Sequence, residues 1–204
     1  MIYFYSGTPG SGKSLHVAKD IWFKLFLKKQ NVIANFPINE QLYDSKKNKG
    51  SFLYVDTFQM TPQFFVDYSE KNHIKGKEGQ TLVIIDECQL LYNPRAWNDK
   101  YRISWIEFFT QHRKFGYNFI LISPFDRLID RQIRSLFEYE VKHRKVNNFK
   151  IAKILPISVF CFVNYWYGVN ERIDCEFFIY RKKYASLYDS YRNFSSTKEI
   201  ENNS

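Results

Sequence analysis

The sequence has little cysteine and none of the cysteine spacings that build disulfide or zinc sites. Three cysteines occur in 204 residues, at positions 88, 161 and 175, and no two of them form a C-x-x-C pair. An odd number of widely spaced cysteines indicates neither a disulfide framework nor a zinc site, and it fits a reducing, cytosolic setting. Internal repeats and low-complexity tracts are also missing, which excludes solenoids and fibrous arrays.

A hydrophobic run long enough to cross a membrane is missing as well. The best candidate, residues 154–169, is shorter than the roughly 20 residues that a bilayer requires, and it contains Pro156 and Asn164. We therefore predict a strand there and no transmembrane helix. Only six residues precede Gly7, so we expect no signal peptide and a cytoplasmic location.

The composition is that of a basic globular protein. Hydrophobic residues make up 45% of the chain, which at this length predicts one α/β domain and a small appendage. Aromatic residues, at 19%, exceed what one small core can hold, so some must reach a surface or a subunit contact. The net charge of +9 favours anionic partners such as nucleic acid or acidic lipid headgroups. A charge that only keeps the protein soluble explains it equally well.

The motif that organises the chain is a glycine-rich loop near its start. Residues 1–5 form an apolar, aromatic run suited to a short buried strand, and residues 7–14 follow the pattern G-x-x-x-x-G-K-S. Apolar residues then recur at three- and four-residue spacing, which predicts a helix over about residues 13–28. In this context the loop's backbone N–H groups converge on phosphate oxygens. The predicted nucleotide-binding residues are Gly7, Thr8, Pro9, Gly10, Ser11, Gly12, Lys13, Ser14 and Leu15.

Two side chains of this loop carry specific chemistry. Lys13 is expected to reach the β- and γ-phosphates of ATP and to act in catalysis, and the Ser14 hydroxyl is expected to ligate Mg²⁺. The alternative is a glycine-rich turn that binds nothing. The flanking strand and helix argue against that alternative.

A second motif follows a buried strand. Residues 81–87 read T-L-V-I-I-D-E, so two carboxylates end an uninterrupted apolar run of the kind found in the middle of a parallel sheet. Such sheets bind ligands at their carboxyl edge. Asp86 is expected to hold Mg²⁺, and Glu87 to orient or deprotonate the attacking water as a catalytic residue. An acidic turn without function is the alternative, which the upstream phosphate loop disfavours.

Further strands follow the same pattern of alternating elements. Residues 31–36 are predicted as the second strand, and residues 118–123 as another central strand. Ser123 lies at its end, where a catalytic hydroxyl could sense the γ-phosphate. Residues 126–137 are predicted as one helix, and residues 138–146, which alternate apolar and charged side chains, as an edge strand.

The C-terminal part is aromatic. Residues 157–166 and 175–181 predict an antiparallel pair around a turn at residues 170–172. Their rings could stack on single-stranded nucleic acid, although core or subunit contacts are the more common role of such residues. We divide the chain into a P-loop ATPase core at 1–147, a β extension packed on it at 148–192, and a disordered tail at 193–204.

Several short motifs occur in a fixed order along this chain. They are D-E-C-Q at 86–89, Q-H-R-K-F-G at 111–116, I-D-R-Q-I-R at 129–134, Y-R-K-K at 180–183 and L-Y-D-S-Y at 187–191. Together with the glycine-rich loop they resemble the zonular occludens toxin family, the N-terminal ATPase of filamentous-phage assembly and export proteins. The resemblance covers about residues 1–192, and the ordered set is more specific than the loop alone.

The resemblance implies a fold and a setting. The fold is a P-loop ATPase with a mostly parallel sheet of order 5-1-4-3-2, helices on both faces and an extra strand between the two nucleotide motifs. The setting is a homo-oligomer, expected as a hexameric ring, that uses ATP and Mg²⁺ at the inner face of the host membrane during extrusion of phage DNA or a DNA–coat complex.

Two departures from the family pattern matter. Relatives have threonine-glutamine where this chain has Ser123-Pro124, so only the hydroxyl can be carried over. Relatives also continue into a membrane helix, whereas this sequence ends at residue 204, so we expect attachment through a partner membrane protein.

The resemblance also selects an arginine. Arg134 ends the I-x-x-x-I-R segment and is the first candidate for a catalytic arginine finger from a neighbouring subunit, followed by Arg131 and Arg113. A solvated helix face or a salt bridge is the more common role of any one arginine.

Two classes of function fit these residues. The first is an ATP-hydrolysing motor. The second is a nucleotide-gated scaffold or DNA-binding assembly protein with little turnover. A small-molecule kinase fits less well, because a carboxylate pair suits attack by water.

Overall fold

The computed structural model describes residues 1–95, 99–146 and 158–188. Its strands are β1 Ile2–Ser6, β2 Asn31–Ala34, β3 Phe52–Tyr54, β4 Thr81–Ile85, β5 Tyr117–Ile122, β6 Tyr139–Lys145, β7 Val159–Trp166 and β8 Glu171–Ile179. They form one sheet of order β3-β2-β4-β5-β1-β6-β7-β8. The first six strands of this order run parallel to their neighbours, and β7 and β8 add an antiparallel extension.

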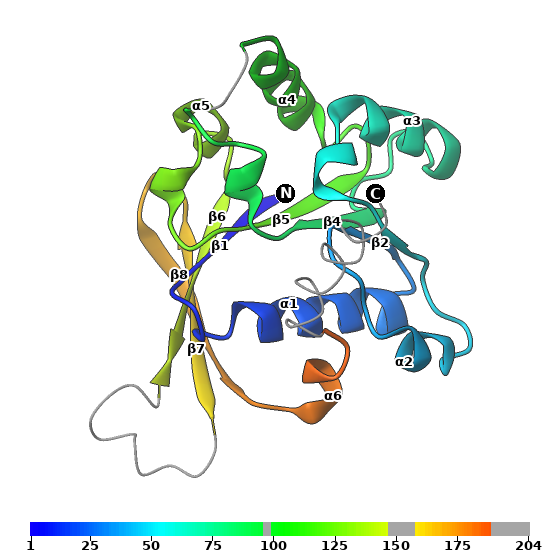
Figure 1. The fold of residues 1–204 in the computed structure, drawn as a ribbon, viewed down its shortest axis with the longest axis vertical. Coiled ribbons are helices and arrows are strands. Elements are labelled where there is room, and N and C mark those ends of the chain that lie inside the picture. The colour runs from blue at the N-terminus through cyan, green and yellow to red at the C-terminus, as the bar shows by residue number, and fades with distance from the viewer. Residues whose placement is uncertain (96–98, 147–157, 189–204) are drawn as a thin grey trace, which may run out of the picture.

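Helices cover both faces of the sheet (Figure 1). They are α1 Lys13–Trp22, continued by a π-helical turn Phe23–Leu27, α2 Glu40–Asp44, α3 Pro62–Asn72, α4 Asp99–Gln111, α5 Arg131–Arg134 and α6 Lys182–Ala185. α3, α4 and α5 lie on one side, and α1, α2 and α6 on the other (Figure 1). Because side chains alternate along a strand, Phe4 belongs to the core under α4 and Tyr5 to the core over α1.

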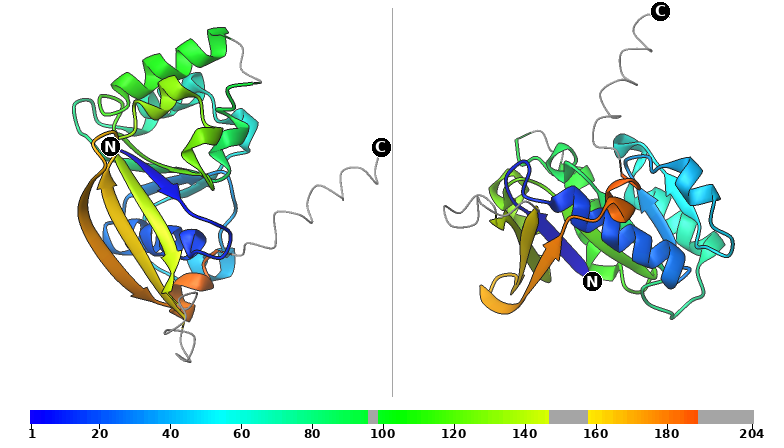
Figure 2. Two further views of the ribbon diagram at one scale, coloured as in Figure 1. Left: turned by 90° about the vertical axis from the view of Figure 1, so that its left-hand side faces the viewer. Right: turned by 90° about the horizontal axis from the view of Figure 1, so that it is seen from below.

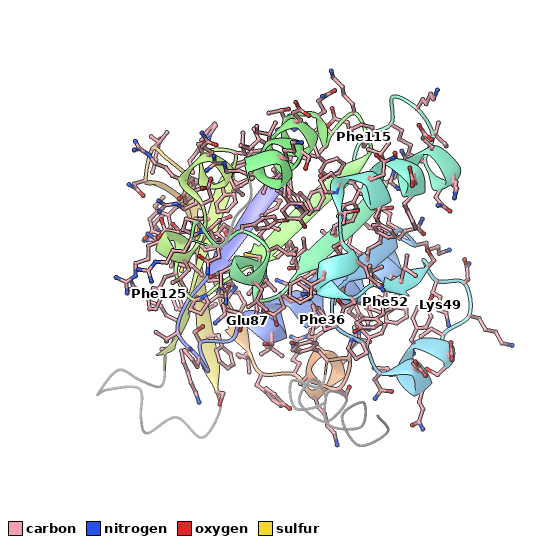
Figure 3. The ribbon with its side chains drawn as sticks, turned by 45° about the horizontal axis from the view of Figure 1, so that its top comes forward. Phe36, Lys49, Phe52, Glu87, Phe115 and Phe125 are labelled. Carbon is pink, nitrogen blue, oxygen red and sulfur yellow. The ribbon has the colours of Figure 1, made fainter. Side chains whose placement is uncertain are left out.

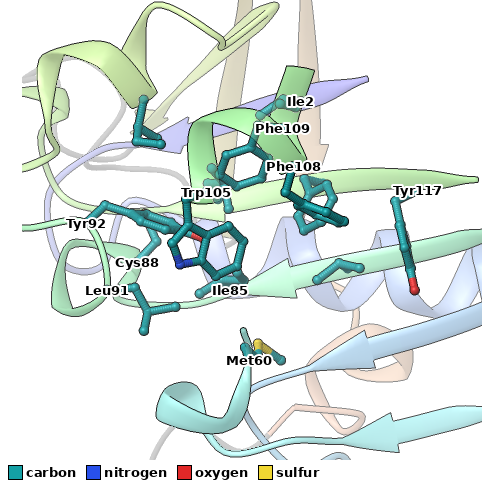
Figure 4. Packing of buried hydrophobic residues seen from close by; sticks show 14 of the residues in the cluster. Ile2, Met60, Ile85, Cys88, Leu91, Tyr92, Trp105, Phe108, Phe109 and Tyr117 are labelled. Atoms are coloured by element: carbon teal, nitrogen blue, oxygen red, sulfur yellow. The ribbon is translucent and has the colours of Figure 1, made fainter. Parts of the chain in front are cut away.

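The core under α4 is dense in aromatic rings. Trp105, Phe108 and Phe109 of α4 point at the sheet, where Tyr92 meets Trp105 edge to face at 5.1 Å (Figure 4). Many aromatic residues therefore pack inside this layer, while others, such as Phe58 and Phe177, are exposed as the composition predicted.

The predicted sheet order is confirmed. The five strands predicted for the core correspond to β1, β2, β4, β5 and β6, and their observed order β6-β1-β5-β4-β2 is the expected 5-1-4-3-2. All five residues of β4 are buried, as its unbroken apolar run indicates. The carboxyl ends of β2, β4 and β5 lie along one end of the sheet, where Figure 3 labels Phe36, Glu87 and Phe125.

The predicted edge position of β6 is wrong. β6 pairs in parallel with β1 and antiparallel with β7, so it is interior to the sheet. The alternation of apolar and charged residues in β6 instead reflects that one face of the strand is buried against α1 and the other is more exposed. His143 is buried against His16 of α1, while its strand neighbours Lys142 and Arg144 point to the opposite face of the sheet.

Two local predictions also need correction. Residues 126–137 form a 3-10 turn, Asp126–Leu128, and then the short α5, because the Asp130 side chain accepts hydrogen bonds from the backbone N–H groups of Gln132 and Ile133 and so begins a new helix. The turn between β7 and β8 lies at residues 167–170, earlier than predicted. Its positive φ values fall on Gly168 and Asn170, the residue types that adopt them most easily.

No helix in the described ranges is long and apolar enough to cross a membrane. Of the aromatic segment at 154–169, residues 159–166 form β7 as predicted, and residues 154–157 lie outside the described part. The predicted disordered tail lies outside it as well.

Candidate nucleotide-binding site

The glycine-rich loop joins β1 to α1 and lies against β6 and β7. Gly7 and Gly12 have φ angles of 143° and 99°, which favour glycine. A Cβ atom on Gly12 would lie 2.5 Å from the Phe160 ring, and one on Gly7 would lie 2.8 Å from the His143 carbonyl oxygen. The loop can therefore lie this close to the sheet only because both positions lack a side chain.

The polar groups of the loop are poised for an anion. The Lys13 Nζ atom donates to the carbonyl oxygens of Gly7 at 2.6 Å and Thr8 at 3.3 Å, so the amine spans the loop. Burial lowers the pKa of Lys13, and the charges of Asp86 and Glu87 oppose that shift. The Ser11 hydroxyl is buried and has no hydrogen-bond partner among the described residues. A phosphate group would satisfy these donors.

Asp86 follows β4 and is held by its backbone. The Asn35 side-chain amide donates to the Asp86 carbonyl oxygen at 2.8 Å and accepts from the Asp86 backbone N–H at 2.7 Å. Burial raises the pKa of the Asp86 carboxyl. Sequence reasoning missed Asn35, whose one signal is its place directly after the second strand.

Glu87 is exposed and takes a left-handed backbone conformation, with φ 49° and ψ 42°. Its carboxylate accepts a hydrogen bond from the Gln89 side-chain amide. This turn directs Glu87 away from the buried end of β4, so its carboxylate is accessible to water.

The two motifs meet at a residue from the far end of the chain. The Tyr188 hydroxyl donates to Asp86 Oδ2 at 3.0 Å, and Tyr188 lines the same cavity as Ser14. Tyr188 therefore lies close to both predicted metal ligands, Ser14 and Asp86. Burial raises the pKa of Tyr188, so its hydroxyl is protonated.

These donors fit a magnesium ion. A serine hydroxyl and an aspartate carboxylate are hard oxygen ligands, and Mg²⁺ is commonly held by one or two protein oxygens together with nucleotide phosphates and water. Within the described residues no group of three or more His, Cys, Asp or Glu side chains gathers to hold a metal by itself. The site therefore suits an ion that arrives with its nucleotide.

Two cavities flank the loop. One, of about 470 Å³, is lined by residues 10–15 together with Phe160, Tyr180, Ala185 and Tyr188, and its aromatic walls suit a nucleobase. The other, of about 650 Å³, lies on the opposite side of Gly7 and Thr8 and includes Asp126, Lys142 and Arg144 in its wall.

The side chains of Ser123 and Arg134 hydrogen-bond to residues outside this constellation, although the Ser123 backbone N–H donates to the Tyr5 carbonyl oxygen at 3.2 Å and so lies beside the start of the loop. Ser123 is buried, and its hydroxyl donates to the Phe125 carbonyl oxygen at 3.2 Å. Arg134 pairs with Asp126 at 3.2 Å, and its buried Nε atom has no hydrogen-bond partner among the described residues. No hydrogen bond or ion pair in the described residues joins either side chain to Lys13 or Asp86. Both catalytic roles stay predictions.

The other two arginine candidates also differ in their surroundings. Arg113 forms an ion pair with Glu138, and Arg131 is exposed on α5.

Comparison with known proteins decides the family. The model of the zonular occludens toxin (Zot) family matches residues 1–193. The chain belongs to the zonular occludens toxin family. Its curated relatives include the Gene 1 protein of Escherichia phage If1, 35% identical over 158 residues, and that of Enterobacteria phage fd, 27% identical over 151 residues. These matches cover 75% and 72% of this chain but only 44% and 42% of the relatives, so the chain spans less than half of their length.

Solved structures show the same fold. The N-terminal domain of zonular occludens toxin from Neisseria meningitidis superposes with a TM-score of 0.56 at 17% identity, covering 92% of this chain and 98% of that domain. The ATPase domain of a second protein gives a TM-score of 0.60 at 10% identity and covers 92% and 84% of the two chains. The fold of this zonular occludens toxin family member is therefore that of P-loop ATPase domains.

Two buried histidines connect the loop of this family member to β6. His16 Nδ1 lies 2.9 Å from His143 Nε2, and His143 Nδ1 lies 3.0 Å from the Ser6 carbonyl oxygen. Burial lowers the pKa of each imidazole to about 3. His143 of β6 is therefore a structural residue that contacts α1 and the end of β1 beneath the loop.

This pair predicts acid sensitivity. On unfolding, the two histidine pKa values rise from about 3 to about 6.5, so the unfolded chain takes up two protons in that window, while Asp20, whose pKa burial raises to about 6, releases one. We expect the free energy of unfolding to fall as the pH drops below about 6.5, by roughly 1.4 kcal/mol per pH unit for each net proton taken up. Urea titrations at pH 7.5, 6 and 5 measure it, and His143→Gln should flatten the dependence. Equal stability at pH 7.5 and 5 would contradict it.

Proposed function

We propose that this chain is the ATP-hydrolysing domain of a motor for filamentous-phage assembly and DNA extrusion. The observation that carries the proposal is the meeting of the two nucleotide motifs, since the Tyr188 hydroxyl binds Asp86 and Tyr188 lines the same cavity as residues 10–15 of the loop. Membership of the zonular occludens toxin family and the phage origin of the curated relatives support the phage setting.

The residues of the two nucleotide motifs have different roles in the proposed hydrolysis. Backbone N–H groups of residues 7–15 hold the phosphates, and the Lys13 amine exchanges its present carbonyl partners for phosphate oxygens. Ser14 and Asp86 would hold Mg²⁺, which when bound neutralises phosphate charge. The exposed Glu87 carboxylate orients the attacking water and accepts its proton. Ser123 would sense the γ-phosphate only after its hydroxyl leaves the Phe125 carbonyl.

A homo-oligomer would complete the site. Arg134 is ion-paired with Asp126, a residue in the wall of the cavity beside Gly7 and Thr8, and it does not contact the Lys13 side of its own loop. An arginine finger supplied by a neighbouring subunit, as in a hexameric ring, fits this placement.

The uncovered face of the sheet supports an anionic partner. β6, β7 and β8 lie side by side with one face turned away from α1 (Figure 2). Across them the register aligns Arg144 with Cys161 and Phe177, and it places Tyr165 beside Arg172. Phe177 is 68% exposed, and both arginines are exposed. Cations interleaved with exposed rings suit a single-stranded nucleic acid. We propose phage DNA or a DNA–coat complex as the partner, at the cytoplasmic face of the host membrane beside a membrane partner protein.

Lys13→Ala tests the proposal. We expect magnesium-dependent ATP hydrolysis by the unmodified protein and its loss to background in the variant, because one charge that neutralises the transferred phosphate is removed. Phosphate release at saturating ATP measures it, and Lys19→Ala, on the same helix but paired with Glu176, should retain the activity. If the unmodified protein binds ATP but does not hydrolyse it, the scaffold alternative holds.

A further inference from the structure

Tyr188 occupies an unexpected place for a residue so late in the chain. It follows Asp86 by 102 positions, and yet its hydroxyl donates to Asp86 Oδ2 at 3.0 Å. It belongs to a segment, residues 181–188, that follows β8, forms α6 and contributes Ala185 and Tyr188 to the lining of the 470 Å³ cavity, which Ser14 also lines. Figure 1 shows this segment beside α1, on the side of the sheet away from α4.

The segment is fastened at several points besides Tyr188. The Lys183 amine lies 3.5 Å from the Trp22 ring centroid, and the Tyr184 ring meets Trp22 edge to face at 5.7 Å. The Leu187 side chain is buried, and its carbonyl oxygen accepts from the Asn39 backbone N–H at 3.0 Å. Replacing the Tyr188 hydroxyl therefore loosens one end of the segment without removing these other contacts.

The ring and the hydroxyl of Tyr188 make separate contacts. The ring packs edge to face on Phe36 at 4.5 Å, a contact that phenylalanine would keep. The hydroxyl alone binds Asp86. Tyr188→Phe therefore removes the polar contact and little else.

A bound Mg²⁺ and the Tyr188 hydroxyl would compete for Asp86 and for the space beside Ser14. Mg²⁺ binds its ligands at about 2.0–2.1 Å in near-octahedral geometry, so the Ser14 oxygen must turn a lone pair to the ion. At present an Asp86 lone pair accepts the Tyr188 proton, and Tyr188 lies in the wall of the cavity that Ser14 also lines. An ion between these residues, with its water shell, would take the space in which the Tyr188 oxygen lies.

We propose that Tyr188 is a positioning residue of the magnesium site. Its hydroxyl holds Asp86 in place beside Ser14 in the metal-free protein and is displaced when magnesium–nucleotide binds, which loosens the segment 181–188. This inference rests on the proposed nucleotide function. The conformation of the segment 181–188 would then depend directly on whether magnesium–nucleotide is bound. Tyr188 also belongs to the L-Y-D-S-Y motif, to which the proposed function assigns no role.

Nucleotide binding tests the competition. Binding of a non-hydrolysable ATP analogue is titrated by calorimetry at a series of Mg²⁺ concentrations in the unmodified protein and in Tyr188→Phe. Removing a hydrogen bond to a carboxylate should lower the Mg²⁺ concentration needed for half-maximal binding by about tenfold. Tyr184→Phe is the matched control, since its ring lies in the same segment and its hydroxyl makes no hydrogen bond within the described residues.

Trypsin tests the release. Arg181, Lys182 and Lys183 are exposed cleavage sites in the segment. Cleavage there, followed by mass spectrometry, should accelerate several-fold when the magnesium–analogue complex is added to the unmodified protein, and in Tyr188→Phe it should be fast without nucleotide. Tyr184→Phe should behave as the unmodified protein does.

The outcomes separate the two proposals. An unchanged or higher Mg²⁺ requirement in Tyr188→Phe, or protection of the segment by nucleotide, overturns the role of Tyr188 while the nucleotide site stands. Failure of the unmodified protein to bind the analogue at any Mg²⁺ concentration overturns the proposed function itself.

Discussion

Glu87→Gln should lower the rate of ATP hydrolysis by about 10²- to 10⁴-fold while leaving nucleotide affinity within a few-fold of its starting value, which is the usual cost of losing a general base. Glutamine keeps the shape of the side chain and its contact with Gln89 but cannot accept a proton from water. The exposed, left-handed position of Glu87 leaves room for this exchange without disturbing β4. Phosphate release and analogue binding are measured on the same preparation.

Gln89→Ala is the matched control for this change. It removes the partner of the Glu87 carboxylate and leaves the carboxylate in place, so a loss of hydrolysis of tenfold or less is expected. Equal rates in Glu87→Gln and the unmodified protein would remove Glu87 from the chemistry.

Arg134→Ala should reduce ATP hydrolysis by about 10³-fold or more, with nucleotide binding retained, if its guanidinium stabilises the transferred phosphate in a neighbouring subunit. The side chain is now paired with Asp126, so it must exchange that partner within the assembly. Arg131→Ala, in the same short helix and exposed, is the control and should keep most of the activity. The melting temperature of both variants is measured alongside, because breaking the pair with Asp126 changes stability as well.

Mixing variants distinguishes a finger in trans from a residue acting within its own subunit. Arg134→Ala and Lys13→Ala should each be inactive alone, but in the proposed ring a mixture of the two would form some interfaces that join an intact loop to an intact arginine. We expect part of the activity to return on mixing. If mixed subunits stay inactive although they assemble, Arg134 does not act across the interface.

The nucleotide motifs and the core of the sheet could be predicted because each rests on neighbouring residues. Residues 7–14 carry their own conformational requirement, since positive φ at Gly7 and Gly12 is open to glycine and closed to most other residues. The unbroken apolar run of β4 indicates that this strand is buried on both faces of the sheet. The strand order was predicted from the resemblance of the chain to the zonular occludens toxin family, and the sequences of the strands themselves do not specify it.

The errors arose where a distant contact overrides a local pattern. The charged alternation of β6 suggested an edge, but β7 pairs with it through residues whose place in space no local pattern gives. The continuous apolar spacing at 126–137 suggested one helix, but the Asp130 carboxylate satisfies two backbone donors and begins a second one.

The amino-acid order alone determined the phosphate loop, the acidic pair and the parallel core, because backbone sterics and burial on both faces are properties of short segments. Folding in three dimensions decided the rest. It placed Asn35 against Asp86, sealed His16 against His143, and brought Tyr188 to Asp86. Such contacts depend on side chains from separate elements meeting at one edge of the sheet, and no spacing along the chain encodes that meeting.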